Sequence, residues 1–208
     1  MDGVFMFKLL KSAAVILLVM GAVYAYSIYR DSQTLNKQII RLHVVADTDN
    51  AVDQEVKLLV RDEVLRLVDS IKNGAKSKEE ALMKLQEQLP SLQEAANAVL
   101  RSAGQDYDAV VTLQQEAFPT RNYETFSLPA GLYDSLRVTI GSGEGKNWWC
   151  VVFPDLCVPA ASSDVEDTAV EAGFSDTLSK TLTREAGYEV RFWILDCFGK
   201  LRNFFHMG

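Results

Sequence analysis

An uncharged apolar run lies near the start of the chain, ahead of a region with helix and strand patterns. The run covers residues 12–29, and as a helix at ~1.5 Å per residue it would be about 27 Å long, close to the hydrocarbon thickness of a bilayer. Lys8 and Lys11 precede the run, which favours a cytoplasmic N-terminus and export of the rest. Ala25 is small enough to precede a cleavage site. Residues 1–30 are therefore predicted to be either a signal peptide or a retained signal anchor.

The next region begins with a strand pattern that leads into an amphipathic helix. Residues 39–46 are rich in β-branched residues, and their even-numbered apolar side chains share one face. Residues 47–50 have turn chemistry and supply a helix cap. Residues 52–73 then carry a single apolar stripe at helical spacing, made of Val56, Leu59, Val60, Val64, Leu67, Val68 and Ile71.

A second helical region starts at a capping box formed by Ser77 and Glu80. Pro90 is expected to break or kink it, and the helical pattern resumes until Gly104. Strand patterns follow, separated by proline and glycine. They cover residues 109–117, 123–128, 133–140 and 148–153.

This order of elements predicts an α+β domain over residues 31–158. We expect a mostly antiparallel sheet of about five strands, packed by two to three helices. Residues 159–189 are acidic and are interpreted as a linker or a loosely packed helical excursion. Residues 190–208 are predicted to form an aromatic amphipathic helix that docks on the domain, lies on a membrane surface or binds a partner.

Charge and composition narrow the classes of function. The chain of 208 residues has a formal net charge of −7. Residues 1–30 hold three basic residues and one acid, so the remainder carries −9. A nucleic-acid binder needs a basic surface, and this class is therefore excluded. Two histidines and three cysteines are too few for a histidine-rich metal site, a closed four-ligand zinc site or a disulfide scaffold.

Two loops resemble ligand-binding motifs. Asp47, Asp49 and Asp53 follow the first predicted strand and would either hold a divalent cation or serve as helix cap and first-turn acids. The glycine-rich residues 141–146 lack the hydroxyl residue of a P-loop, because Asn147 follows the lysine. We therefore expect a hairpin turn there, and no metal or cofactor is predicted for the chain.

Candidate catalytic residues are sparse, and no catalytic site is assigned. His43 is predicted to lie on the strand face opposite the apolar residues, either as an ordinary histidine or paired with Asp49 or Asp53. Cys150 and Cys157 flank a proline turn and can form a disulfide in an exported domain if their Cα atoms come within ~7 Å.

Arginine and tryptophan residues supply candidate interface anchors. Arg121 follows a turn and Arg137 lies on a predicted strand, where each would either contact a partner or form a salt bridge on the sheet. Trp148 and Trp149 point to opposite faces if both are in a strand. One tryptophan is therefore expected in the core and the other at an interface or beneath the C-terminal helix.

Several of these motifs together resemble the stage II sporulation protein R family. The resemblance covers residues 39–158 and departs from the family pattern at Asp47, where asparagine is expected, and at Asp155, where a second proline is expected. The matching stretches are IRLHVVADTD (40–49) with Asp53, Gln54, Lys57 and VRD (60–62), FPTR (118–121), LPAG (128–131) with Tyr133 and LRV (136–138), and GxGxGxNWWCVVFP (141–154) with Leu156 and Cys157.

The resemblance implies a function that composition does not reveal. Members of this family are made in the forespore and exported to the space between the forespore and mother-cell membranes. There they activate a membrane-embedded aspartic protease, stage II sporulation protein GA, which leads to processing of pro-sigma-E. The family member is thus a signal and not an enzyme. The residues expected to contact the protease are Arg41, His43, Asp49, Asp53, Arg121, Arg137, Trp148 and Trp149.

Two other readings remain at this point. One is an exported hydrolase of cell wall or peptide, which would use His43 with a neighbouring aspartate. The other is a structural module tethered to the membrane through residues 12–29, with residues 190–208 as a second contact.

Overall fold

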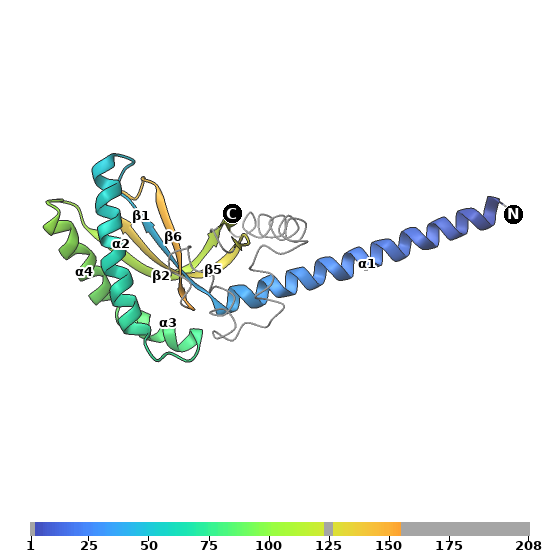
Figure 1. The fold of residues 1–208 in the computed structure, drawn as a ribbon, viewed down its shortest axis with the longest axis horizontal. Coiled ribbons are helices and arrows are strands. Elements are labelled where there is room, and N and C mark those ends of the chain that lie inside the picture. Colours follow the sequence, from blue (N-terminus) through green and yellow to red (C-terminus); the bar gives the residue numbers. More distant parts are fainter. Residues whose placement is uncertain (1–2, 123–126, 155–208) are drawn as a thin grey trace, which may run out of the picture.

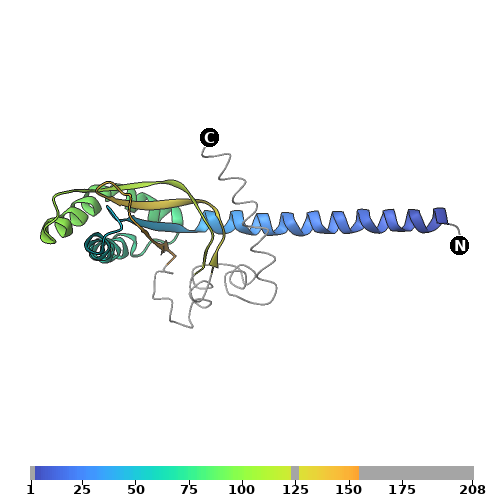
Figure 2. The same ribbon diagram turned by 90° about the horizontal axis from the view of Figure 1, so that it is seen from above.

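A computed structural model describes residues 3–122 and 127–154 of the chain. The predicted linker over 159–189 and the predicted helix over 190–208 lie outside the described residues. The described part is an α+β domain preceded by a long helix, α1 (Gly3–Gln38), which runs away from the domain as an extended rod (Figures 1 and 2).

Helix α1 contains the predicted membrane or export segment. Its window Leu10–Ser27 has a mean hydropathy of 1.6 and is not buried against the rest of the chain. By length and composition this window could cross a membrane, and it is equally compatible with a signal sequence. The helix continues to Gln38, so residues 31–38 are helical and lead directly into the first strand.

A mixed four-stranded sheet forms the centre of the domain. Its strand order is β2-β5-β1-β6. The two outer pairings are antiparallel, whereas the central pair of β1 and β5 is parallel. The strands are β1 (Ile40–Val45), β2 (Ala109–Phe118), β5 (Gly131–Ile140) and β6 (Asn147–Phe153).

Three helices cover one face of this sheet, and their ends follow the sequence signals. Helix α2 (Ala51–Lys72) begins after Asn50, whose side chain accepts a hydrogen bond from the Asp53 amide. Helix α3 (Lys78–Glu87) is capped by Ser77 in the same way. Helix α4 (Leu89–Ser102) has proline in its first turn, which confirms the predicted break at that point.

The core lies between the helices and this face, which we call the helix-covered face. Helices α2 and α4 lie against this face (Figure 1), and alternate side chains of β1 and β5 meet the apolar stripes of these helices in the core. Fully buried members include Ile40, Leu42, Val44, Val60, Val64, Leu92, Ala96, Leu136 and Val138.

The predicted sheet of about five strands is wrong in number by one. Arg121 and Leu128 instead pair within a separate two-stranded ladder formed by β3 (Arg121–Asn122) and β4 (Ser127–Leu128). Pro129 lies opposite Thr120 in the register of β2 with β5, and it lacks the amide hydrogen for a bond at that position, so the pairing of the main sheet is interrupted there.

The predicted hairpin at residues 141–146 is also wrong, because β5 and β6 do not pair with each other. Strand β1 lies between them, and the glycine-rich loop crosses over its end. The amides of Glu144 and Gly145 donate to the carbonyls of Asp47 and Ala46. A side chain at Gly145 would collide with the Thr48 carbonyl, which explains glycine at this close crossing.

A buried lysine connects α1 to the domain through a hydrogen bond and an ion pair. Lys78 Nζ donates to the Asn36 carbonyl at 3.0 Å and forms an ion pair with Asp134 at 2.5 Å. The ammonium therefore neutralises a carboxylate on β5 and also satisfies a carbonyl in the last turn of α1. This contact joins the end of the export segment to α3 and the sheet.

Candidate functional site

The sheet face away from the helices carries a cluster of charged and aromatic side chains, which we call the cation–aromatic face. It arises because alternate residues of each strand point away from the helices. The sheet register places His43 of β1 between Arg137 of β5 and Trp149 of β6. The face consists of Arg41, His43, Glu116, Phe118, Tyr133, Arg137 and Trp149, together with Arg121 from β3.

Trp149 is the centre of the aromatic contacts. The His43 ring stacks on the Trp149 indole, with ring centroids 3.9 Å apart and an interplanar angle of 16°. The Arg121 guanidinium lies 4.9 Å from the centroid of the same indole, and Phe118 approaches it edge-on at 5.0 Å. Trp149 is thus held in one orientation by the stacked His43 ring, the Arg121 guanidinium and the edge of Phe118.

Glu116 is the acidic centre of this face. Its carboxylate accepts hydrogen bonds from Arg137 Nη1 at 2.9 Å and Gln114 Nε2 at 3.1 Å, and lies 3.4 Å from His43 Nδ1. Burial raises the pKa of Glu116, but the hydrogen bonds, first from His43 and then from Arg137, outweigh burial and lower the pKa to about 2. Glu116 is therefore ionised at neutral pH and holds Arg137 in place.

Arg41 is expected from the sequence to contact a partner, and the structure contradicts that expectation. Its side chain is fully buried. The guanidinium lies 4.0 Å from the Phe118 ring centroid and 5.0 Å from that of Tyr133. A buried guanidinium over two aromatic rings supports the face from within and offers no surface for a partner to touch.

Of the two alternatives for His43, that of an ordinary packed histidine is confirmed, whereas the pairing with Asp49 or Asp53 is not found, since Glu116 takes that place. His43 is only 6% exposed, and its Nε2 atom is buried without a hydrogen-bond partner. A hydrolytic site needs a base that can reach a nucleophile or water in an open cleft. His43 instead packs its ring within the sheet face, and the predicted His–Asp arrangement is absent from the described residues.

The aspartates after β1 serve the local structure. Asp53 is buried and accepts hydrogen bonds from Thr48, Asn50 and Tyr107. The hydrogen bond from the Thr48 hydroxyl, followed by that from Tyr107, holds the pKa of Asp53 below its usual value. Asp49 accepts from the Lys146 amide at 2.7 Å. Of the predicted alternatives, the role of first-turn acid is confirmed for Asp53 only, since the cap of α2 is Asn50 and Asp49 instead bonds to the glycine-rich loop.

The two adjacent tryptophans divide between the two faces, as the strand alternation predicts. Trp148 packs against the core on the helix-covered face, where the Arg61 guanidinium of α2 lies 4.9 Å from its ring centroid. Trp149 lies on the cation–aromatic face under Arg121 at the same distance of 4.9 Å. The chain therefore contains two arginine–tryptophan contacts of similar geometry in different surroundings.

Cys150 follows these tryptophans on the helix-covered face. It is buried and disulfide-bonded. Its predicted partner Cys157 lies outside the described residues, so the pairing of these two cysteines stays a prediction.

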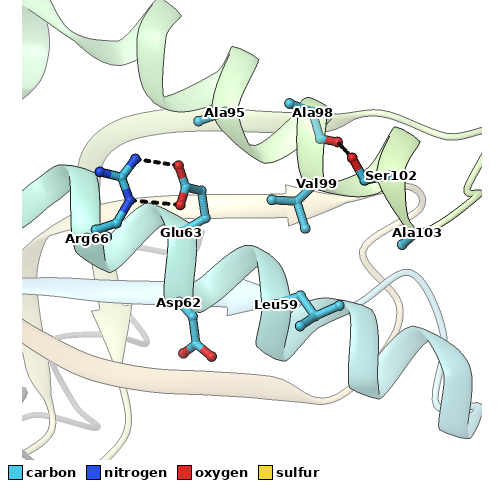
Figure 3. A pocket seen from close by; sticks show the side chains of 9 residues that line it. All are labelled: Leu59, Asp62, Glu63, Arg66, Ala95, Ala98, Val99, Ser102 and Ala103. Carbon is cyan, nitrogen blue, oxygen red and sulfur yellow. Dashed lines mark hydrogen bonds and ion pairs between the residues drawn. The ribbon is translucent and has the colours of Figure 1, made fainter.

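A shallow groove of about 570 Å³ lies between α2 and α4, on the outside of the helix layer (Figure 3). Its lining is mainly apolar, with Leu59 and Val99 on facing helices. Glu63 and Arg66 at its edge hydrogen-bond to each other at 2.6 and 2.9 Å. These charges neutralise one another, the hydroxyl of Ser102 donates to the Ala98 carbonyl, and no histidine is among the lining residues, so the groove carries no evident chemistry.

Sequence patterns alone missed Glu116, Phe118 and Tyr133 as members of the cation–aromatic face. Glu116 lies in an alternating strand pattern, which would assign it to a solvent-facing side. Its partners come from β5 and β1, so only the register of three strands reveals that it faces Arg137 and His43. A glutamate and an arginine on two predicted strands of the same region are the one signal that points to this pairing.

Comparisons with known proteins agree with the resemblance carried by the sequence motifs. The sequence model of the family described as Stage II sporulation protein R matches residues 36–163. The Stage II sporulation protein R of Bacillus subtilis (strain 168) is 30% identical over 183 residues, which span 77% of this chain and 82% of that protein. No solved structure matches the chain significantly.

Proposed function

Because the chain belongs to the stage II sporulation protein R family, which supports a role in sporulation, we propose that it is an exported signal that activates a protease. Its target is a membrane-embedded aspartic protease of the mother cell, stage II sporulation protein GA or a close relative. Activation leads to processing of pro-sigma-E. In this proposal the chain acts by binding, and the bond cleavage belongs to the protease.

Export is the first requirement of this function, and α1 supports it. No residue of the apolar window Leu10–Ser27 is buried, as expected of a segment that meets lipid or the export machinery. Lys8 and Lys11 at its start favour a cytoplasmic N-terminus. The domain that follows α1 then lies in the space between the forespore and mother-cell membranes, whether the segment is cleaved or retained.

Binding is the second requirement, and the arginines of the cation–aromatic face are the observation that carries the proposal. The Arg137 side chain is 34% exposed, while its guanidinium is held by Glu116, whose side chain is only 11% exposed. Arg121 is held over Trp149 in the same region. Arginines whose orientation is fixed before binding lose little conformational entropy when a partner docks, which suits them as interface anchors.

Activation requires more than binding. A ligand shifts a protein toward its active conformation only if it binds that conformation more tightly than the inactive one. We therefore propose that Arg121 and Arg137 contact a surface that the membrane domain of the protease presents in its active arrangement. Asp49 and the exposed edge of Trp149 border this contact region.

The test replaces each arginine in the full chain and follows pro-sigma-E in sporulating cells that contain no other member of this family. Arg121→Ala and Arg137→Ala are each expected to reduce conversion of pro-sigma-E at least tenfold, because each removes an interface anchor. Immunoblots of the precursor and the mature sigma factor measure the conversion. The amount of exported variant is measured in the same samples.

Arg61→Ala is the matched control. It removes an arginine that lies over a tryptophan at the same 4.9 Å distance, but on the helix-covered face. Conversion should remain at the wild-type level in this variant. Normal conversion in both Arg121→Ala and Arg137→Ala would show that this face does not contact the protease.

A further inference from the structure

The outer edge of β2 is an unusual feature of the described domain, because side chains of the domain cover only the first half of this edge. β2 is an end strand of the sheet and pairs on one side only, with β5. Exposed strand edges carry unpaired amides and carbonyls, and proteins usually cover or interrupt them to avoid association. The way in which this edge is covered indicates where a second strand can pair.

The register of β2 with β5 fixes which backbone groups face outward. The Gly141 amide donates to the Asp108 carbonyl at 2.9 Å, and Ala109 lies opposite Ile140. In an antiparallel pair the residues alternate between bonding to the partner strand and pointing away from it. Even-numbered residues of β2 therefore bond to β5, and odd-numbered residues direct their amides and carbonyls outward.

Helix α4 covers the first part of this edge with two side chains. The Ala109 amide donates to Asn97 Oδ1 at 2.7 Å, and the Val111 amide donates to Gln93 Oε1 at 3.1 Å. A pairing strand cannot use these amides without displacing both side chains. The next outward-facing residues, Leu113, Gln115 and Ala117, receive no such cover from the described residues, and Gln115 is exposed.

The uncovered stretch ends where β2 ends, at Phe118, which precedes Pro119. Five residues, 113–117, are thus available, with Gln115 at their centre. Two copies of this stretch can pair antiparallel about a twofold axis through Gln115, so that Leu113 of each copy lies opposite Ala117 of the other. Because all three residue pairs in this register face outward, each of them can exchange two backbone hydrogen bonds.

The side chains of the stretch are complementary to themselves in that register. Gln114 of one copy lies opposite Glu116 of the other, on the cation–aromatic face, and an amide beside a carboxylate forms a favourable cross-strand pair. No two like charges lie directly opposite each other. On the helix side, Met83 of α3 is 62% exposed in a groove that Leu113 also lines, and a second strand along this edge would cover it.

We propose that the uncovered edge of β2, residues 113–117, binds a second copy of this chain. The two four-stranded sheets then become one continuous sheet across a twofold axis at Gln115. A symmetric pairing of this kind is self-complementary and closed, so it yields a dimer and not a filament.

Chemical crosslinking of the full chain tests the register directly. Gln115→Cys brings two cysteines together at the twofold axis, where the Cα atoms of a hydrogen-bonded pair lie about 5.5 Å apart, within disulfide reach. We expect Gln115→Cys in membranes to form a covalent dimer on mild oxidation, at least tenfold more than Val110→Cys. Val110 is 54% exposed on the same strand but far from the axis, and wild type measures the background from native cysteines.

Light scattering of the detergent-solubilised full chain tests the same edge without new cysteines. Gln115→Pro removes one outward amide and no hydrogen bond to β5, so we expect a monomer, while Gln115→Thr should remain a dimer like wild type. Gln114→Glu places like charges opposite each other and should weaken dimerisation about tenfold. Gln114→Lys should strengthen it. Circular dichroism checks that each variant is folded.

A wild-type chain that is monomeric at 100 µM would overturn the proposal, as would a dimer that both Gln115→Pro and Gln114→Glu leave intact. Crosslinking at Val110→Cys equal to that at Gln115→Cys would overturn it too. These readouts do not involve the protease, so they stand or fall separately from the proposed function.

Discussion

The two faces of the central sheet differ in the kind of interaction that holds them. Strand β1 contributes residues to both faces. Leu42 enters an aliphatic core beneath α2 and α4, while His43 lies on the cation–aromatic face. On the helix-covered face the contacts are mostly apolar, and many alternative shapes would fill the same volume. On the cation–aromatic face the contacts are directional, because stacked rings, guanidinium groups and a carboxylate each require a particular orientation.

This difference shows that the burial of a residue does not by itself tell whether the residue supports the fold or the candidate binding surface. Arg41 and His43 are as buried as many core residues. However, the side chains that Arg41 and His43 contact hold Arg121, Arg137 and Trp149 in position. These three residues are partly exposed. The cation–aromatic face thus has a buried layer that orients an accessible layer, whereas the helix-covered face has no comparable arrangement among the described residues.

The largest expected effect concerns the helix-covered face. Leu42→Ala removes a fully buried side chain from the centre of the core, and the cavity and lost apolar contacts should lower the free energy of unfolding by about 2–5 kcal/mol. Denaturant unfolding of the full chain in detergent, followed by tryptophan fluorescence, measures this. A loss below about 1 kcal/mol would mean that this face is not the main source of stability.

The next effect concerns the cation–aromatic face and depends on pH. The pKa of Glu116 is about 2 in the folded chain, below its ordinary value of 4.5. The stability it contributes is therefore fully present above about pH 4.5 and is lost as the pH falls toward 2. Between pH 6 and pH 3 the wild type should lose about 2 kcal/mol through this one group.

Glu116→Gln removes that titration while keeping the size of the side chain. The difference in unfolding free energy between pH 6 and pH 3 should shrink by about the same 2 kcal/mol in this variant. Asp49→Asn is the control for the loss of a carboxylate away from the cation–aromatic face, because Asp49 is exposed in the loop after β1. An identical pH dependence in wild type and Glu116→Gln would refute the hydrogen-bonded arrangement around Glu116.

The helices were predictable from sequence because their signals are local. The apolar stripe of α2 repeats at helical spacing, and the predicted range of 52–73 differs from Ala51–Lys72 by one residue at each end. Ser77 and Pro90 likewise act through their own backbone and that of the next turn. Such signals need no knowledge of the rest of the fold.

The sheet order and the cation–aromatic face were harder to predict because they depend on residues far apart in the chain. A glycine-rich stretch between two strand patterns is typical of a hairpin, yet here it crosses β1, which comes about 100 residues earlier. Alternation placed His43 on the correct face but not in contact with Glu116. That contact requires the parallel pairing of β1 with β5, for which the sequence carries no local signal.

The smallest expected effect compares the two arginine–tryptophan contacts. Arg121→Ala and Arg61→Ala each remove a guanidinium that lies 4.9 Å from an indole centroid, and such a contact at a partly exposed site contributes about 0.5–1 kcal/mol. The ion pair of Arg61 with exposed Asp62 adds little to this. Both variants should therefore unfold within about 1 kcal/mol of wild type in the same denaturant experiment.

Equal and small losses of unfolding free energy in Arg121→Ala and Arg61→Ala would separate the effect of each arginine on stability from its effect on conversion of pro-sigma-E. Any loss of pro-sigma-E conversion specific to Arg121→Ala could then not be attributed to unfolding, since Arg61→Ala would be equally stable. If Arg121→Ala instead destabilised the domain by several kcal/mol, Arg121 would belong to the supporting layer with Arg41. The contact with the protease would then have to rest on Arg137 and the exposed edge of Trp149.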